Sequence, residues 1–188
     1  MKSLGEFATG IDRIEIINDA PNPFEHNLSQ YGHQTFTGGA GYNTAMKAAC
    51  AAGAAEDGPS IWLEEDFFLT APVDFTAIAN HLEGHPYLAQ IVLQRQPWFK
   101  NEVGAGNMLQ PLRNKGKTFT SVGGYLEHRA FFSGNPSVWR KEVFEMGWPD
   151  GEWSEDSKRD QLLEAGFSFA ITPDILCNHD GERSGKDY

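Results

Sequence analysis

The sequence predicts an α/β fold in one domain, because strand-like and helix-like segments alternate along its 188 residues. Six short apolar segments have the composition of strands: residues 13–19, 60–65, 87–93, 119–122, 130–132 and 167–172. Four longer segments between them are predicted as helices: 42–55, 73–82, 136–146 and 155–165. This alternation predicts a sheet with helices packed on it.

Local signals support the predicted boundaries. Asn135 before Pro136 is the expected N-cap of one helix, and Ser154 is the expected N-cap of the helix that Gly166 closes. The Gly-, Pro- and Asn-rich stretches 20–32 and 97–116 are predicted as functional loops rather than linkers, because both are embedded in the domain.

Composition narrows the class of protein. A net charge of -11 argues against binding to bulk nucleic acid, whose phosphates carry the same sign. No apolar run approaches the roughly 20 residues that cross a bilayer, and the first residues lack the apolar core of a signal peptide. Two cysteines far apart in sequence do not form a disulfide framework. We therefore expect a cytoplasmic protein without a membrane span.

Three acids lie at the end of one predicted strand. The strand 60–65 ends in Glu64 and Glu65, and Asp66 follows it directly. Carboxylates at a strand end usually hold a divalent cation. The strand 13–19 ends at Asp19, and the helix 42–55 lies between these two strands. We expect a βαβ unit that brings both sets of acids to one end of the sheet. The alternative is a solvated sheet edge.

Glycines open the helix at 42–55. Gly39 and Gly41 could offer backbone N–H groups to a phosphate, although their spacing is neither a P-loop nor a dinucleotide-binding fingerprint. The alternative is a tight turn that allows close helix packing. Asp19 could likewise begin a turn with Ala20 and Pro21.

The order of these motifs resembles the nucleotide-binding half of family 2 glycosyltransferases with the GT-A fold, where the acidic triplet is the "DxD" motif. Further matches are residues 132–137, 147–149, 154–156 and 179–188, and the chain looks like the small transferases often encoded by bacteriophages. The resemblance runs from about residue 13 to the end and implies a mixed sheet flanked by helices. It places a nucleotide and metal half at about 1–95 and an acceptor and catalytic half at about 96–188.

The chain departs from the family pattern at its beginning. The first strand and most of the first helix of a GT-A domain would precede a segment like residues 1–10, and neither is visible in the sequence. A shortened fold, a mis-assigned start codon or a partner chain that supplies the strand would each explain this departure.

The resemblance also implies a metal and donor site. Asp66 is the main ligand for Mn²⁺ or Mg²⁺, and His179 completes the metal site. Glu64 faces the ribose, and Glu65 supports the metal ligand. Further residues are expected near the nucleotide of the donor, a UDP-sugar by family habit: Asp19, Gly39, Gly41 and Asn43.

The expected catalytic and acceptor residues lie in the matches between residues 132 and 156. Glu155 and Asp156 match the acidic pair of the family, and Asp156 is the expected general base for an inverting transfer. Acids in the first turn of a helix also stabilise its dipole, which is the structural alternative. The expected acceptor site consists of Gly134, Asn135, Trp148 and Trp153.

The C-terminal tail carries Arg183 and Lys186 among glycines and acids. We expect it to close over the diphosphate as a lid, the alternative being a frayed terminus.

These expectations describe a metal-dependent glycosyltransferase acting in the cytoplasm, that of a bacterial host if a phage encodes it. Its acceptor would be a glycan, a protein or a modified DNA base. A noncatalytic or partner-dependent module that binds nucleotide sugars is the first alternative, and a glycoside hydrolase with two carboxylates is the second.

Overall fold

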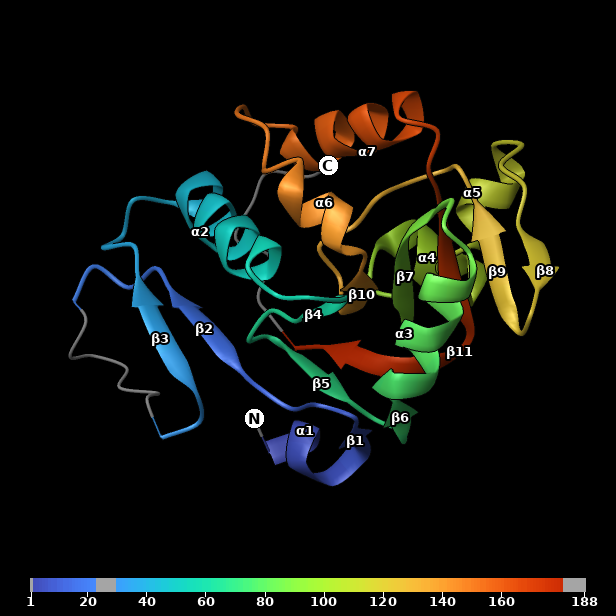
Figure 1. Cartoon of the computed structure of the whole chain (residues 1–188). Coiled ribbons are helices and arrows are strands. Elements are labelled where there is room, and N and C mark those ends of the chain that lie inside the picture. Colours follow the sequence, from blue (N-terminus) through green and yellow to red (C-terminus); the bar gives the residue numbers. More distant parts are fainter. Residues whose placement is uncertain (1, 23–29, 181–188) are drawn as a thin grey trace.

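A computed structural model of the protein describes residues 2–22 and 30–180 (Figure 1). A seven-stranded mixed sheet dominates it, with the order β4-β10-β7-β11-β9-β8 and with β5 paired to β11. The strands are β4 (Ser60–Trp62), β5 (Phe67–Leu69), β7 (Leu88–Arg95), β8 (Thr120–Val122), β9 (Tyr125–His128), β10 (Ser137–Trp139) and β11 (Ser168–His179). This sheet confirms the prediction of an α/β protein with a mixed sheet.

The direction of the strands explains how the sheet is built. β10 is antiparallel to both of its neighbours, β4 and β7, so these two strands run parallel to each other. β11 is parallel to β7 and antiparallel to β9 and β5. All eight residues of β7 are buried, as expected for a strand covered on both faces.

Two smaller sheets lie outside this one. β1 (Ala8–Thr9) pairs with β6 (Val73–Asp74), and β2 (Glu15–Asn18) pairs in parallel with β3 (His33–Phe36). The predicted βαβ unit is therefore wrong, because β2 pairs with β3 instead of joining the sheet of β4. The Glu15 carboxylate binds His33 Nδ1 at 2.6 Å and accepts from Thr35 Oγ1 at 3.1 Å, which ties β2 to β3.

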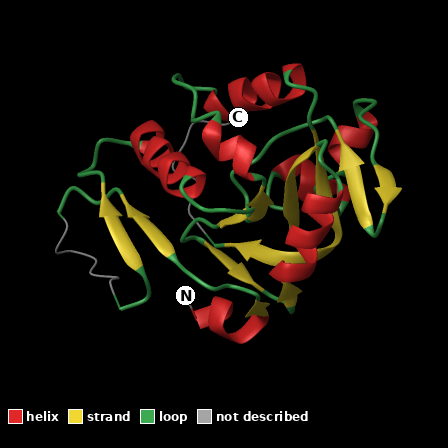
Figure 2. Cartoon of the chain, in the orientation of Figure 1, coloured by secondary structure: helices red, strands yellow, loops and turns green. Residues whose placement is uncertain are grey.

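Helices cover both faces of the large sheet (Figure 2). They are α1 (Lys2–Phe7), α2 (Tyr42–Ala54), α3 (Phe75–Gly84), α4 (Lys100–Ala105), α5 (Gln110–Asn114), α6 (Lys141–Glu145) and α7 (Ser154–Glu164). Apolar residues of α3 pack with Ile91 and Leu93 of β7. On the other face, α2, α6 and α7 pack with Ala89, Trp139 and Phe169. Three predicted helices are confirmed to within a few residues: α2, α3 and α7.

Other boundaries differ from the predictions. Residues 137–139 form β10 rather than the first turn of a helix, because their backbone pairs with β4 on one side and with β7 on the other and their side chains are fully buried. Asn135 is consequently not an N-cap, and only α6 remains of that helix. Residues 130–132 are not a strand, and the 97–116 stretch contains α4 and α5.

At the ends of α7, one expectation is confirmed and one is wrong. Gly166 follows α7 with a φ of 92°, as expected of a closing glycine. Ser154 is the first residue of α7, and Trp153 occupies the N-cap position.

Two buried basic side chains satisfy carbonyls at helix C-termini. Arg140 donates to the carbonyls of Leu82 and His85 at the end of α3, the latter at 3.0 Å. Lys158 donates to Val143 O at 2.8 Å and to Gly147 O at 2.6 Å, around the end of α6. Burial lowers the pKa of Lys158 to about 8. Both contacts replace the hydrogen bonds that a helix end lacks.

No described helix has the length and apolar character needed to cross a membrane.

The buried side chain of His128 predicts a loss of stability in acid. Burial lowers its pKa to about 3, whereas an unfolded histidine titrates near about 6.5. The unfolded chain therefore binds the extra proton between these values, and the free energy of unfolding falls as the pH drops through this window. Urea unfolding from pH 7 to pH 4.5 should show a slope about 1 kcal/mol per pH unit steeper in the wild type than in His128→Phe. Parallel pH profiles for the two proteins would contradict this prediction.

Candidate functional site

The acidic triplet lies in the connection between β4 and β5. Phe67 N–H donates to Glu64 O at 3.3 Å, which closes the connection into a turn. β5 then pairs with the end of β11, so that Phe67 lies opposite His179 and Asp180 N–H donates to Asp66 O at 2.8 Å. Strand pairing thus brings Asp66 and His179 together from distant parts of the chain.

The side chains of Asp66 and His179 face each other directly. His179 Nε2 lies 3.0 Å from Asp66 Oδ2. Asp66 Oδ1 and His179 Nδ1 are also buried, and neither has a hydrogen-bond partner among the described residues. A carboxylate oxygen and an imidazole nitrogen that lack partners are suitable ligands for Mn²⁺. No three His, Cys, Asp or Glu side chains of residues 2–22 and 30–180 gather closely enough to hold a metal by themselves.

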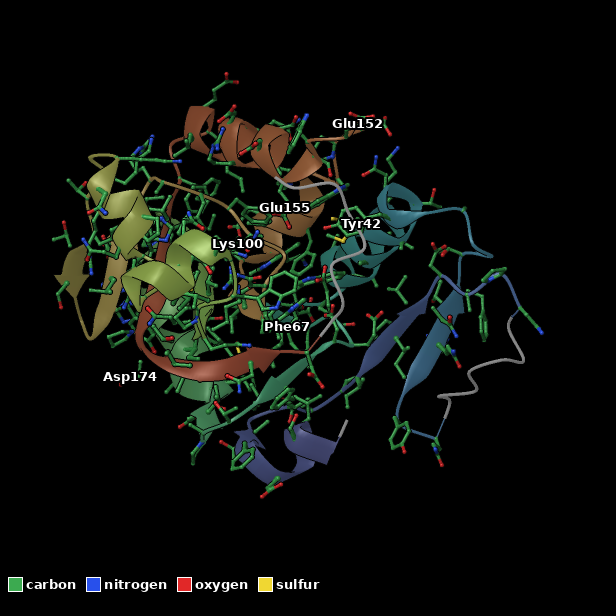
Figure 3. The ribbon with its side chains drawn as sticks, turned by 180° about the vertical axis from the view of Figure 1, so that it is seen from behind. Tyr42, Phe67, Lys100, Glu152, Glu155 and Asp174 are labelled. Carbon is green, nitrogen blue, oxygen red and sulfur yellow. The ribbon has the colours of Figure 1, made fainter. Side chains whose placement is uncertain are left out.

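Two further acids, Glu64 and Glu155, lie close to Gly134. Glu155 Oε1 accepts a hydrogen bond from Gly134 N–H at 2.8 Å. A Cβ atom on Gly134 would lie 2.7 Å from Glu155 Oε1, 3.2 Å from Glu64 Oε1 and 3.5 Å from the hydroxyl of Tyr42. In Figure 3, Glu155 and Tyr42 are labelled close together near the middle of the view, whereas Glu152 and Asp174 lie toward its edges. Glycine at position 134 therefore leaves open the space where these polar atoms meet.

The electrostatics of this group are unusual. Burial raises the pKa of Glu64 to about 8, and the neighbouring carboxylates of Glu155 and Asp66 add to this rise. Burial also raises the pKa of Glu155, against the opposite effect of its hydrogen bond from Gly134 N–H. Carboxyl groups with raised pKa values can hold or accept a proton near neutral pH, as general acids and bases must.

A buried glutamine of β7 fixes the turn that contains Gly134. Gln90 Nε2 donates to Ser133 O at 2.5 Å and to Ser137 Oγ at 2.9 Å, and Gln90 Oε1 accepts from Ser133 N at 3.2 Å. The predicted acceptor residue Asn135 lies in the same turn, where its N–H donates to Ser133 Oγ at 3.1 Å. The turn is therefore held from the core of the sheet.

The predicted nucleotide residues form a separate loop structure. The carboxylate of Asp19 accepts from the hydroxyl of Thr37 and from Gly41 N–H, the latter at 2.9 Å. Gly39 and Gly41 adopt φ values of 71° and 91°, which explains why glycine is present there. Asn43 Nδ2 donates to Gly151 O at 3.1 Å and so ties the start of α2 to the loop before α7.

The remaining predicted site residues differ in how exposed they are. Asp156 is exposed and binds Arg159 at 2.5 Å on the same helix, so that Glu155 and not Asp156 faces Gly134. Trp148 is buried in the core and stacks on Trp139, whereas Trp153 is 58% exposed beside α7. Glu65 is exposed. Two predicted residues lie outside the described part of the chain: Arg183 and Lys186.

Sequence reasoning missed residues that lie at the site. The ring of Trp98 packs against the ring of His179, with centroids 4.0 Å apart. Gln96 brackets the main chain of His179 with two hydrogen bonds, each of 2.9 Å. Trp98 belongs to the stretch 97–116, which the sequence predicts only as a loop, and Gln96 lies between that loop and the predicted strand 87–93. Nothing in the sequence signals that either residue contacts residue 179, more than 80 positions away in the chain.

Comparisons with known proteins add no assignment. A scan against protein-family models and a search of curated proteins each found no match to this chain.

The raised pKa of Glu64 leads to a prediction about stability. In the folded protein Glu64 holds its proton up to about pH 8, whereas an unfolded glutamate loses it near about pH 4.3. The folded state therefore binds more protons between these values, and stability is lost as the pH rises through them. Without metal, Glu64→Gln should gain stability relative to the wild type, by about 1 kcal/mol for each pH unit from pH 5 to pH 8. Glu65→Gln is the matched control at an exposed carboxylate, and an equal gain in both variants would contradict the prediction.

The contact between Gly134 and Glu155 can be measured by a double-mutant cycle. A methyl group at position 134 would meet Glu155 Oε1 at 2.7 Å, so Gly134→Ala should destabilise the wild type by about 1 kcal/mol through overpacking. In the Glu155→Ala background the same substitution should cost almost nothing. Equal costs of Gly134→Ala in both backgrounds, measured by chemical unfolding, would show that the two residues are not in contact.

Proposed function

We propose that this protein is a metal-dependent glycosyltransferase that moves a sugar from a nucleotide-diphosphate donor to an acceptor hydroxyl. The observation that carries the proposal is the Asp66–His179 pair, 3.0 Å apart, beside the acids at Gly134. One buried oxygen of Asp66 and one buried nitrogen of His179 have no partner among the described residues. The resemblance to family 2 glycosyltransferases assigns a metal to these two residues, and their contact supports that assignment.

In this proposal Asp66 and His179 hold Mn²⁺ or Mg²⁺ at the donor diphosphate. Such a cation, when bound, offsets the charge that develops on the leaving nucleoside diphosphate. Asp66 Oδ1 and His179 Nδ1, which lack hydrogen-bond partners among the described residues, are the atoms that would act as ligands, while His179 Nε2 keeps its contact with Asp66 Oδ2. Glu64 lies next to this pair and would face the ribose of the donor.

The geometry favours Glu155 over Asp156 as the general base. Glu155 accepts from Gly134 N–H and points into the space that this glycine leaves open, whereas Asp156 is exposed and paired with Arg159. The raised pKa of Glu155 suits a group that takes a proton from an acceptor hydroxyl. Direct attack by that hydroxyl on the anomeric carbon would invert its configuration.

The residues proposed to contact the donor lie in the half at about 1–95, and those proposed to contact the acceptor lie in the half at about 96–188. Asp19, Gly39, Gly41 and Asn43 would contact the nucleotide, a UDP-sugar by family habit. Trp153 and the turn around Gly134 would receive the acceptor, because sugars stack on exposed aromatic rings. The mixed sheet, with acids directly after β4, is the part of the architecture that supports a GT-A fold.

Two other functions have observations in their favour. β4 is the last strand of its sheet, with one edge unpaired in the described part of the chain, as in a shortened transferase that binds a donor without turnover. Glu64 and Glu155 lie close to one point, as two carboxylates of a retaining glycoside hydrolase would. The proposed transferase differs from both, because it needs metal and consumes its donor.

Thermal unfolding with a panel of nucleotide-diphosphate sugars, with and without Mn²⁺, tests the proposal. A donor at about 100 times its dissociation constant should add roughly 2.7 kcal/mol of stability, and this gain should require Mn²⁺. Asp66→Ala and His179→Ala should abolish the gain, whereas Asp174→Asn, at an exposed acid away from the site, should retain it. Release of nucleoside diphosphate in the presence of an acceptor would separate transfer from binding.

Each of the other functions gives a different outcome. A metal-dependent gain without any consumption of donor would identify the noncatalytic module. Metal-independent cleavage of glycosides would identify the hydrolase. The absence of any stabilisation by donors and Mn²⁺ would overturn the proposal.

A further inference from the structure

A buried ion pair holds the segment that contacts His179. Arg95, the last residue of β7, binds Glu102 of α4 through two hydrogen bonds, Nη1 to Oε2 at 2.7 Å and Nη2 to Oε1 at 3.1 Å. The two side chains are only 6% and 10% exposed. Removing two charges from water is costly, and such a pair is retained where it fixes a geometry.

The ion pair fixes the segment between its two members. Glu102 Oε2 also accepts from Trp98 N–H at 2.9 Å and from Phe99 N–H at 3.2 Å. Arg95 Nη1 donates to Gln96 O at 2.9 Å. The main chain from residue 96 to residue 99 is therefore held at three points by the two charged groups.

This segment contacts His179 from two directions. Gln96 Nε2 donates to His179 O, and His179 N donates to Gln96 Oε1, each at 2.9 Å. The Trp98 ring meets the His179 ring at 63°, with centroids 4.0 Å apart. Phe67 packs on the same imidazole, with centroids 4.6 Å apart. The ring of His179 thus lies between two aromatic side chains, one of which depends on Glu102.

We propose that the Arg95–Glu102 pair is a positioning device that, through Trp98, orients the imidazole of His179 toward Asp66. This inference deepens the proposed function and rests on it for the role of the metal. The orientation itself is a property of the chain without metal. Trp98 and Glu102 are positioning residues, because they act on a ligand and not on the substrate.

The hydrogen bonds of the ion pair explain why residue 102 is a glutamate better than packing does. Its hydrogen bonds with Arg95 and with two backbone N–H groups lower the pKa of Glu102, although burial alone would raise it. A neutral side chain of the same size could fill the space, but only a carboxylate offers enough acceptor sites for the guanidinium and both N–H groups.

The test uses the full chain and two readouts. NMR of ¹³C-labelled histidine, without metal, should show the His179 ring protons shifted by the ring current of Trp98, with His179→Asn identifying the signal. Glu102→Gln and Trp98→Leu should move this signal toward that of an exposed histidine, whereas Trp98→Phe should largely retain it. Lys100→Ala, at an exposed position of α4, is the matched control and should have no effect.

Mn²⁺ binding by electron paramagnetic resonance gives the second readout. Glu102→Gln and Trp98→Leu should weaken the affinity about tenfold to a hundredfold, as loss of supporting contacts does at metal sites, while both variants stay folded by circular dichroism. Trp98→Leu keeps the ion pair and so provides a folded variant if Glu102→Gln unfolds. An unchanged His179 signal in folded Trp98→Leu would overturn the inference. A wild type that does not bind Mn²⁺, with the His179 signal still sensitive to Trp98, would overturn the proposed function and leave the positioning role supported.

Discussion

Polar side chains on and after the buried strand β7 require hydrogen-bond partners, and this requirement organises the loops of the candidate site. Gln90 and Arg95 are almost fully buried, where an unpaired polar group is costly. Gln90 finds its partners in the turn that contains Gly134, and Arg95 finds Glu102. Gln96, one residue beyond the strand, binds the main chain of residue 179. Three segments of the chain, around residues 102, 134 and 179, are thus fixed to β7 and the residue after it.

The groups with potential chemistry come from other elements and are placed against this framework. Glu64 and Asp66 follow the edge strand β4, and Glu155 begins α7. Their backbones are anchored by the pairing of β5 with β11 and by the packing of α7 on the apolar face below it. Reactive side chains held by rigid elements keep their geometry. A change in the Gly134 turn or at Trp98 would therefore act on the site while leaving the acids themselves intact.

The sequence predicts the elements of this structure better than their partners. Alternating strands and helices, the end of α7 at Gly166 and the acids after β4 follow from local composition and spacing. The pairing of β2 with β3 depends on Glu15 reaching across to its neighbours, and the conversion of residues 137–139 into β10 depends on burial between two strands. Which member of the Glu155–Asp156 pair faces the site is a matter of helix rotation. Tertiary contacts decide these points, and short segments of sequence do not contain them.

The carboxylates with shifted pKa values in the interior of this protein are of two kinds. Glu102 is paired with an arginine and two backbone N–H groups, and its pKa is lowered. Glu64 lies among carboxylates, its charged neighbours in the described chain all raise its pKa, and Glu155 is also shifted upward. A network that served only stability would not gather like charges, because each ionisation makes the next one less favourable. Folding can retain such a cluster where a cation or a proton transfer uses it, and a bound divalent ion would relieve the repulsion. The crowding of carboxylates around Glu64 is therefore the strongest physical argument for the proposed function.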